Sequence, residues 1–256
     1  MSDVKFLLKF GKKEHIQQFV AGSLFCSNAA TFWGIEKDLK IKGQGDVLEA
    51  GSRMFAQKLA IQPHGSDETT IINMKSNSLV HYEPAENIPV FCLFSVFEED
   101  CTSEADGNLK MVLSNKTKAA IRGHFPNADS VAIITNPEQF LEDVEKTIGY
   151  PIKHELVHYF NIDKGYNACE GGATAMDMEY MMYLVQDVPP VIENGMKRYV
   201  FHADYVYRVL FCKDVFFEDE QEYRIVLPDE KITKGTHFPV QLSEDIEIRS
   251  LDEFMK

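Results

Sequence analysis

Two glutamates near the C-terminal end have the spacing of a paired-carboxylate site. Glu220 and Glu222 lead into the apolar run 223–227, whose composition is typical of a strand. In an extended chain, residues two apart point to the same face and lie about 7 Å apart. Arg224 continues that face and could hold one carboxylate ionised by pairing with it. The same spacing also fits an acidic turn in which Glu222 and Arg224 form a surface ion pair.

A second pattern, His154-Glu155-Leu156-Val157-His158, matches the H-E-x-x-H signature of zinc peptidases. Zinc binding requires a helix here, because residues i and i+4 then bring both imidazoles to one metal. A third ligand could come from Glu170 or Glu179. Segment 157–162 is β-branched and aromatic, however, so it predicts a strand with the two imidazoles roughly 13 Å apart. We therefore predict no metal site, and a zinc peptidase is the weakest of three functional hypotheses.

Composition narrows the functional classes. The 256 residues carry 26 Lys and Arg against 40 Asp and Glu, which gives a formal charge of −14. That balance argues against a protein that coats nucleic acid or anionic membrane non-specifically, although it leaves room for a local basic cleft. The five cysteines form no C-x-x-C pair, and no run approaches the length of a signal core or a membrane span. We expect a cytoplasmic protein.

The hydrophobic pattern predicts one α+β domain over residues 1–256, with insertions at 98–130 and 163–198. The expected architecture is a single mixed, mainly antiparallel sheet with short helices. Residues 88–97 form the most apolar segment and predict a central buried strand. Further strands are expected at 4–10, 23–27, 69–74, 78–82, 131–135, 156–162, 223–227 and 246–248, with a turn at 75–77.

Helices are expected between these strands. One carries Ile16 and Phe19 inward, and another begins at Asn136-Pro137, an N-cap followed by a proline at the first helical position. Residues 28–51 are interpreted as a loop or short helix over a pocket. Asp46 and Glu49 are interpreted as caps of a helix from about 47 to 55, with a pocket contact as the second alternative. Single histidines such as His15 and His124 are expected to be structural or solvent-facing.

Several segments resemble a family of bacterial and prophage proteins that share a domain of unknown function. In that family the segment that matches 154–161 is a strand and not a metal-binding helix. The resemblance covers both ends of the chain and much of its middle, in segments 9–16, 22–28, 45–49, 154–161, 217–224 and 245–248.

The same layout is similar, more distantly, to the ADP-ribosyltransferase superfamily, and this implies a split-sheet fold that binds NAD. There a first strand carries a basic residue, a second strand ends in a Ser/Thr element, and a late strand carries Q/E-x-E. Lys9 falls on the first position, which is more often Arg or His, and Ser27 with Asn28 falls on part of the second. Glu220 and Glu222 fall on the third.

The resemblance implies an enzyme that cleaves the nicotinamide–ribose bond of NAD and transfers ADP-ribose to an unknown acceptor, as a toxin or phage-conflict effector does. Glu222 would stabilise the positive charge that develops on the ribose, and Glu220 would orient or deprotonate the nucleophile. NAD would be bound by Lys9, Ser27, Asn28, Phe32, Trp33 and Arg224. The alternative hypothesis is a non-catalytic prophage-type protein that binds a nucleotide or a partner protein.

Overall fold

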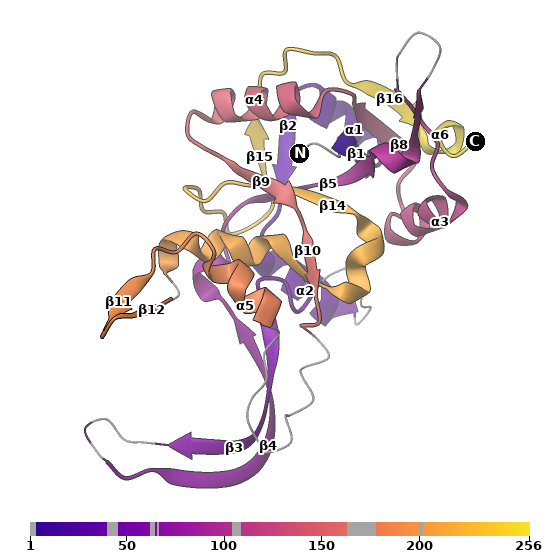
Figure 1. Ribbon diagram of the computed structural model, residues 1–256. Coiled ribbons are helices and arrows are strands. Elements are labelled where there is room, and N and C mark those ends of the chain that lie inside the picture. Colours follow the sequence, from indigo (N-terminus) through magenta and orange to yellow (C-terminus); the bar gives the residue numbers. More distant parts are fainter. Residues whose placement is uncertain are drawn as a thin grey trace.

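The computed structural model describes residues 4–39, 46–61, 65, 67–103, 109–162, 178–199 and 202–256. Its centre is a six-stranded antiparallel sheet in the order β16-β8-β1-β5-β14-β9 (Figure 1). The prediction of a mixed fold with a mainly antiparallel sheet and several short helices is therefore confirmed. The six strands are β1 (Val4–Gly11), β5 (Val90–Phe97), β8 (Ser130–Ile134), β9 (Lys153–Leu156), β14 (Glu222–Val226) and β16 (Glu247–Ser250).

Successive side chains of β1 point to opposite faces of the sheet and therefore enter two different parts of the core. Phe6, Leu8 and Phe10 face one way, as predicted, into an apolar cluster with Phe94. Leu7 faces the other way, into the cluster that contains residues of α1 (Lys13–Val20) and α4 (Pro137–Ile148). Since both faces of β1 are covered, a polar side chain on this strand must find a partner inside the protein.

Helix α4 begins where the sequence predicts. Asn136 caps it by accepting a hydrogen bond from the backbone N–H of Gln139 at 3.3 Å, and Pro137 occupies the first turn. Gly149 ends the helix with φ 85°, a left-handed conformation that glycine adopts without strain. Phe140, Leu141 and Val144 are buried beneath it, so this amphipathic helix closes one face of the sheet.

Strand β5 lies at the centre of the sheet, between β1 and β14, which confirms the prediction for the most apolar segment. β2 (Ser23–Cys26) lies outside this sheet and pairs with β15 (Thr236–Pro239). Beyond β2, an isolated bridge joins Ser27 to Val90 at the start of β5. β5 therefore has β1 on one side and β14 on the other, although the three strands are far apart in the sequence.

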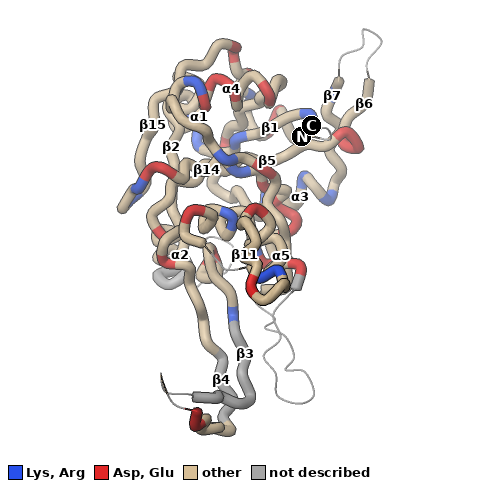
Figure 2. The backbone as a smooth tube through the Cα atoms, turned by 60° about the vertical axis from the view of Figure 1, so that its left-hand side comes forward, with Lys and Arg blue, Asp and Glu red and all other residues tan. Residues whose placement is uncertain are grey.

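A second group of elements lies on the far side of β14 from α1 and α4 (Figures 1 and 2). It contains α2 (Ala29–Leu39), α5 (Met178–Val185) and a 3₁₀ helix, Ala203–Phe211. The 3₁₀ helix runs into β13 (Cys212–Asp214), which pairs in parallel with β10 (His158–Phe160). A second 3₁₀ helix, Val215–Glu220, then leads to β14.

Two expectations for the middle of the chain are wrong. β3 (Gly51–Ile61) follows a turn at 47–50, so no helix spans 47–55. β4 (Thr70–His81) is one strand paired along β3, where the sequence predicted two strands and a turn at 75–77. Ser76 and Asn77 pair with Ala56 and Phe55, and the register shifts between Ala56 and Lys58, so the expected turn is replaced by an irregularity within a continuous strand pair. The ribbon extends away from the body (Figure 1).

The remaining elements are short. Among the described residues, no helix combines the length and apolar character needed to cross a membrane. Region 98–130 contains β6, β7 and α3, and the described part of 163–198 contains α5, β11 and β12. These elements are β6 (Cys101–Ser103), β7 (Leu109–Met111), α3 (Asn115–His124), β11 (Val191–Glu193), β12 (Met196–Arg198), α6 (Leu251–Phe254) and the 3₁₀ helices Glu83–Ala85 and Glu98–Asp100.

Candidate functional site

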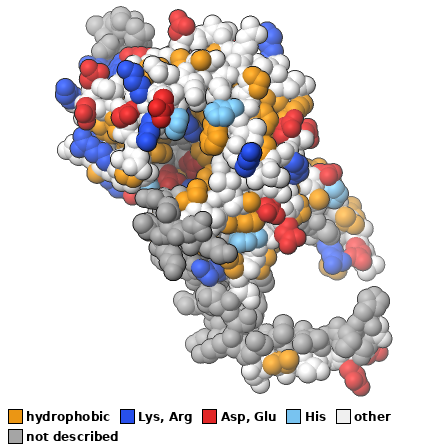
Figure 3. All heavy atoms as spheres, turned by 180° about the vertical axis from the view of Figure 1, so that it is seen from behind, with side chains coloured by type: hydrophobic (Ala, Val, Ile, Leu, Met, Phe, Trp, Pro, Cys, Tyr) orange, Lys and Arg blue, Asp and Glu red, His pale blue; other side chains and the backbone are white. Residues whose placement is uncertain are grey.

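A cavity of about 520 Å³ opens beside β1, β5 and β14. Its size lies in the range of small-molecule sites. The space-filling view from behind has a hollow of this kind, with acidic side chains in its depth and basic and histidine side chains near its rim (Figure 3). The charged and histidine side chains that line the cavity are Lys9, Lys12, His15, Asp46, Glu49, His124, Lys213, Glu220, Glu222 and Arg224.

Glu220 and Glu222 both contact the ammonium group of Lys213. Lys213 Nζ donates to Glu222 Oε2 at 3.2 Å and also to Glu220 Oε2. The pair does not converge by strand alternation, because Glu220 is the last residue of a 3₁₀ helix and only Glu222 belongs to β14. Gln221 joins them with φ 43°, and this left-handed residue turns the chain into the strand. The carboxylates therefore form one cluster with a buried lysine.

Arg224 binds two carboxylates from inside the protein. Its Nε donates to Glu222 Oε1 at 2.7 Å, and its two terminal nitrogens donate to Glu49 Oε1 and Oε2 at 2.5 and 2.9 Å. A further hydrogen bond reaches the carbonyl oxygen of Leu210. Arg224 and Glu49 are each 1% exposed, so their charges are compensated almost entirely by each other and by Glu222. The surface ion pair that the spacing allowed is thus a buried one.

These contacts separate the proton affinities of the two paired glutamates. Burial alone would raise the pKa of Glu222, but Arg224 and Lys213 hold it well below the usual range for a glutamate. Burial raises the pKa of Glu220, and the nearby charge of Glu222 adds to that effect against the attraction of Lys213. The cavity therefore presents one carboxylate that stays ionised and one that takes up a proton more readily.

The predicted NAD-binding residues fall into two groups. Lys9, Phe32 and Arg224 line the cavity with the two glutamates. Lys9 Nζ donates to the carbonyl oxygen of Cys92 at 2.7 Å and lies 4.5 Å from the centroid of the Phe91 ring. Burial lowers the pKa of Lys9, since a low-dielectric environment disfavours the ammonium form.

Ser27, Asn28 and Trp33 do not line this cavity. Asn28 caps the start of α2, because its Oδ1 accepts from the backbone N–H of Thr31 at 3.0 Å. Its Nδ2 donates to the carbonyl oxygen of Ile232 at 2.6 Å. Trp33 donates from Nε1 to the carbonyl oxygen of Glu49 at 2.7 Å and stacks on His81. Trp33 therefore contacts the loop that holds Glu49.

Sequence reasoning assigned no site role to His124 or Lys213, and for Asp46 and Glu49 it offered a pocket contact only as the second alternative, although all four line the cavity. His124 Nδ1 lies 3.4 Å from Glu220 Oε1, and Lys213 is the partner of both glutamates. One signal was available for Lys213, which is a lone cation between the apolar runs 209–212 and 215–217. A buried lysine requires carboxylate partners, and several carboxylates follow Lys213 within ten residues, among them Glu220 and Glu222.

The H-E-x-x-H segment is extended, as predicted. His154 and Glu155 lie in β9, and His158 begins β10. Among the residues that the structure describes, no group of three or more His, Cys, Asp or Glu side chains is arranged to hold a metal ion. The segment instead holds the backbone of Glu222 in place. The Glu222 N–H donates to the Tyr159 hydroxyl at 3.0 Å, and the Glu222 carbonyl accepts from the N–H of Val157 at 2.9 Å.

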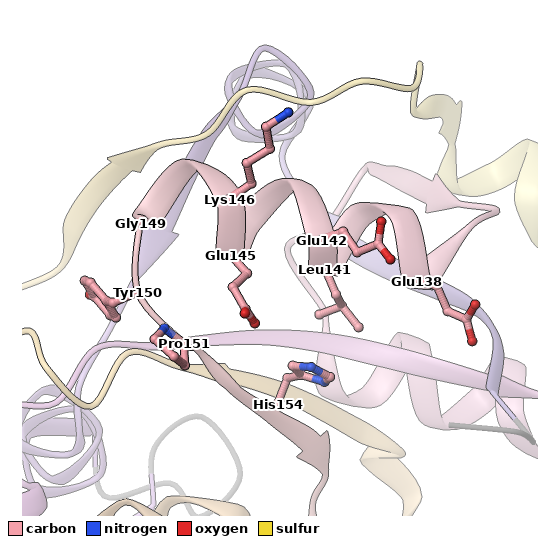
Figure 4. A pocket seen from close by; sticks show the side chains of 9 residues that line it. All are labelled: Glu138, Leu141, Glu142, Glu145, Lys146, Gly149, Tyr150, Pro151 and His154. Carbon is pink, nitrogen blue, oxygen red and sulfur yellow. The ribbon is translucent and has the colours of Figure 1, made fainter.

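A second, larger cavity of about 640 Å³ lies between α4 and the start of β9 (Figure 4). Glu138, Glu142 and Glu145 border it from one side of the helix, and His154 borders it from the strand. His154 Nδ1 already forms a 2.7 Å hydrogen bond with the Tyr223 hydroxyl. This cavity contains none of the residues that the sequence assigned to NAD, and it has no buried ion-pair cluster among the residues that line it.

The chain was compared with protein-family models, with curated proteins and with solved structures, and none of these comparisons gives a match.

Proposed function

We propose that the cavity beside β1, β5 and β14 binds NAD and that the protein transfers the ADP-ribose group of NAD to an acceptor. The observation that carries the proposal is the cluster in which Lys213 contacts both Glu220 and Glu222 beside Lys9. Glu222 of the late strand β14 and Lys9 of the first strand β1 thus line one cavity, which is the arrangement that the resemblance to the ADP-ribosyltransferase superfamily implies. On this proposal the sheet is a variant of the split sheet of that superfamily.

Cleavage of the nicotinamide–ribose bond builds positive charge on the ribose. The C–N electron pair leaves with nicotinamide, and the oxygen of the acceptor bonds to the same ribose carbon and loses its proton. A carboxylate that is already ionised and already oriented stabilises this charge without reorganising during the reaction. Glu222 has these properties, because Arg224 and Lys213 keep its pKa low and fix both of its oxygens.

Glu220 is suited to orienting the nucleophile. One of its oxygens contacts Lys213 and the other lies 3.4 Å from His124 Nδ1. The position of the carboxylate is therefore fixed from two sides. Its raised pKa also reduces the negative charge that would otherwise repel the phosphates of the ligand.

The rest of the cavity carries features that suit a dinucleotide. Lys9 and Lys12 supply positive charge for phosphates, and Phe32 supplies an aromatic face for a base or for nicotinamide. Several of the lining side chains are apolar, including Leu8, Phe94 and Phe217, so part of a ring system would be shielded from water. The net charge of −14 makes a local site for one anionic ligand more plausible than an extended nucleic-acid surface.

Incubation with NAD labelled in its adenylate part and with a cell extract tests the proposal. Wild type is expected to label an acceptor, and Glu222→Gln is expected to lower labelling about 10²–10³-fold, since a preorganised charge is removed. Glu222→Asp retains the charge and serves as a folding control, and Glu138→Gln on the exposed side of α4 is a matched control that should label like wild type. Equal labelling by wild type and Glu222→Gln would contradict the proposal.

A non-catalytic binding protein is the second candidate. The observation that favours it is that Arg224 and Lys213 already bind both oxygens of Glu222, as expected of a structural cluster. It predicts that NAD or another nucleotide raises the melting temperature of the protein without loss of nicotinamide. The convergence of Glu220 with Glu222 supports the enzyme over this candidate, because a binding site for an anion gains nothing from two carboxylates.

A further inference from the structure

The carboxyl groups that line the cavity differ in whether their oxygens are already engaged. Both oxygens of Glu49 bind Arg224, and both oxygens of Glu222 bind Arg224 or Lys213. Glu220 uses one oxygen for Lys213 and the other faces His124. Each of these oxygens already lies against a cation or a histidine.

Asp46 is different. Its side chain lines the cavity and its residue is 4% exposed. Oδ1 accepts a hydrogen bond from the backbone N–H of Leu48 at 2.9 Å, an Asx-type turn that fixes the direction of the carboxyl group. Oδ2 is buried and has no hydrogen-bond partner among the described residues. A buried acceptor without a partner destabilises the fold, because its lost hydration is not replaced. A hydrogen-bond donor on a ligand would offset that cost.

We infer that Asp46 Oδ2 is the atom of this cavity that exchanges a proton with the bound ligand, and this inference rests on the proposed transfer of ADP-ribose. In that reaction Oδ2 accepts the proton of the acceptor hydroxyl while the hydroxyl oxygen bonds to the ribose carbon. The C–N electron pair leaves with nicotinamide, so no other proton donor and no oxidant is needed. Glu220 then has only a positioning role.

The surroundings of Asp46 suit a group that gains and loses a proton near neutral pH. Burial, and secondarily the charge of Glu49, raises the pKa of Asp46 to about 7, while Lys213, Arg224 and the Leu48 N–H act in the opposite direction. A general base works best when its pKa lies near the working pH. The other charged or titratable side chains that line the same cavity are Lys9, Lys12, His15, Cys92, His124, Glu220 and Glu222.

The test measures release of nicotinamide from NAD between pH 5 and 9 for wild type, Asp46→Asn and Glu220→Gln. In wild type, kcat should rise through about pH 7 to a plateau. Asp46→Asn should lower kcat about 10²–10⁴-fold and abolish the rise, with a smaller change in KM. The asparagine Oδ1 can still accept from the Leu48 N–H, and circular dichroism checks the fold. Asp245→Asn, an exposed carboxyl, is the control.

The inference is overturned if Asp46→Asn retains the kcat and pH profile of wild type, or if only Glu220→Gln abolishes the rise. Absence of nicotinamide release from wild type at every pH would instead contradict the proposed function. In that case a carboxyl-carbon NMR titration, assigned with Asp46→Asn, decides the role of Asp46 by itself. A midpoint near 7 supports a proton-exchanging carboxyl, and a midpoint near the ordinary value of about 4 overturns it.

Discussion

Arg224 and Glu49 form a bidentate buried ion pair although 175 residues separate them in the sequence. The pair joins β14 to the turn that precedes β3, and it fixes Arg224 in the position from which it also binds Glu222. The planar guanidinium of arginine suits such an arrangement, because it presents parallel N–H groups to a carboxylate. The conformation of the cavity therefore depends on a long-range contact in its own wall.

Removal of one partner from this pair should destabilise the protein strongly. Glu49→Gln leaves Arg224 with an incompletely compensated buried charge, and we expect a loss of about 3–5 kcal/mol in the free energy of unfolding. Urea denaturation measures the change. The matched control is Glu247→Gln, which breaks a half-exposed pair with Arg249 and should cost no more than about 1 kcal/mol. Similar losses in the two variants would show that burial does not govern the Arg224 pair.

The low pKa of Glu222 makes a prediction about acid stability. A carboxylate whose pKa is depressed on folding stabilises the native state above its unfolded pKa, near 4.3 for glutamate. That stabilisation is lost progressively as the pH falls below this value. Glu222→Gln should therefore be less stable than wild type at pH 7, and the difference should shrink between pH 5 and 2. Urea midpoints across this range provide the measurement, and a difference that does not depend on pH would contradict it.

Asp46 should have the opposite effect on stability. Its pKa is raised to about 7 on folding, so the native state favours the protonated form. The resulting contribution to the free energy of unfolding is complete below the unfolded pKa near 3.9 and is lost as the pH rises through 7. Asp46→Asn cannot ionise and should be more stable than wild type at pH 8, on the order of 2–4 kcal/mol, because each tenfold change in the acid constant is worth about 1.4 kcal/mol.

Thermal or urea unfolding of Asp46→Asn at pH 5 and pH 8 measures this effect. The gain relative to wild type should be larger at pH 8 than at pH 5. Asp245→Asn is exposed and should show no such difference. A gain that is equal at both pH values would mean that the Asp46 carboxyl is ionised in the native state.

The positions of the aromatic and polar residues near α2 predict unequal contributions to ligand binding. Phe32 lines the cavity, whereas Ser27 does not and Trp33 hydrogen-bonds to Glu49. Phe32→Ala should weaken NAD binding about fivefold, since stacking on an aromatic face contributes roughly 1 kcal/mol. Ser27→Ala should bind NAD like wild type. Isothermal titration calorimetry compares the two, and weaker binding by Ser27→Ala alone would contradict the assignment of the cavity.

Local patterns in the sequence predicted much of the main sheet. β1, β5 and β14 are apolar enough to be recognised as strands, and α4 starts with a capping asparagine and a proline. The ribbon β3–β4 was missed in part, because Ser76 and Asn77 have turn propensity that the long pairing with β3 overrides. Propensity alone could not reveal that pairing.

The candidate site was predictable only in part for a related reason. Glu220, Glu222 and Arg224 are close together in the sequence, and their spacing indicated a shared face. Glu49 and Asp46 belong to a turn whose place beside β14 is set by tertiary packing. Lys213 stands out as a cation in an apolar segment, but the sequence does not specify which carboxylates compensate it. Long-range ion pairs of this kind are set by the tertiary fold and cannot be inferred from local spacing.

Release of free nicotinamide from NAD by the purified protein tests the central claim most directly, because water can replace an unknown acceptor. Chromatography should detect nicotinamide with wild type and with Glu138→Gln. With Glu222→Gln the rate should fall about 10²–10³-fold, while Glu222→Asp retains more of it. Release at the wild-type rate by Glu222→Gln, or no release by wild type while NAD binds, would contradict the account.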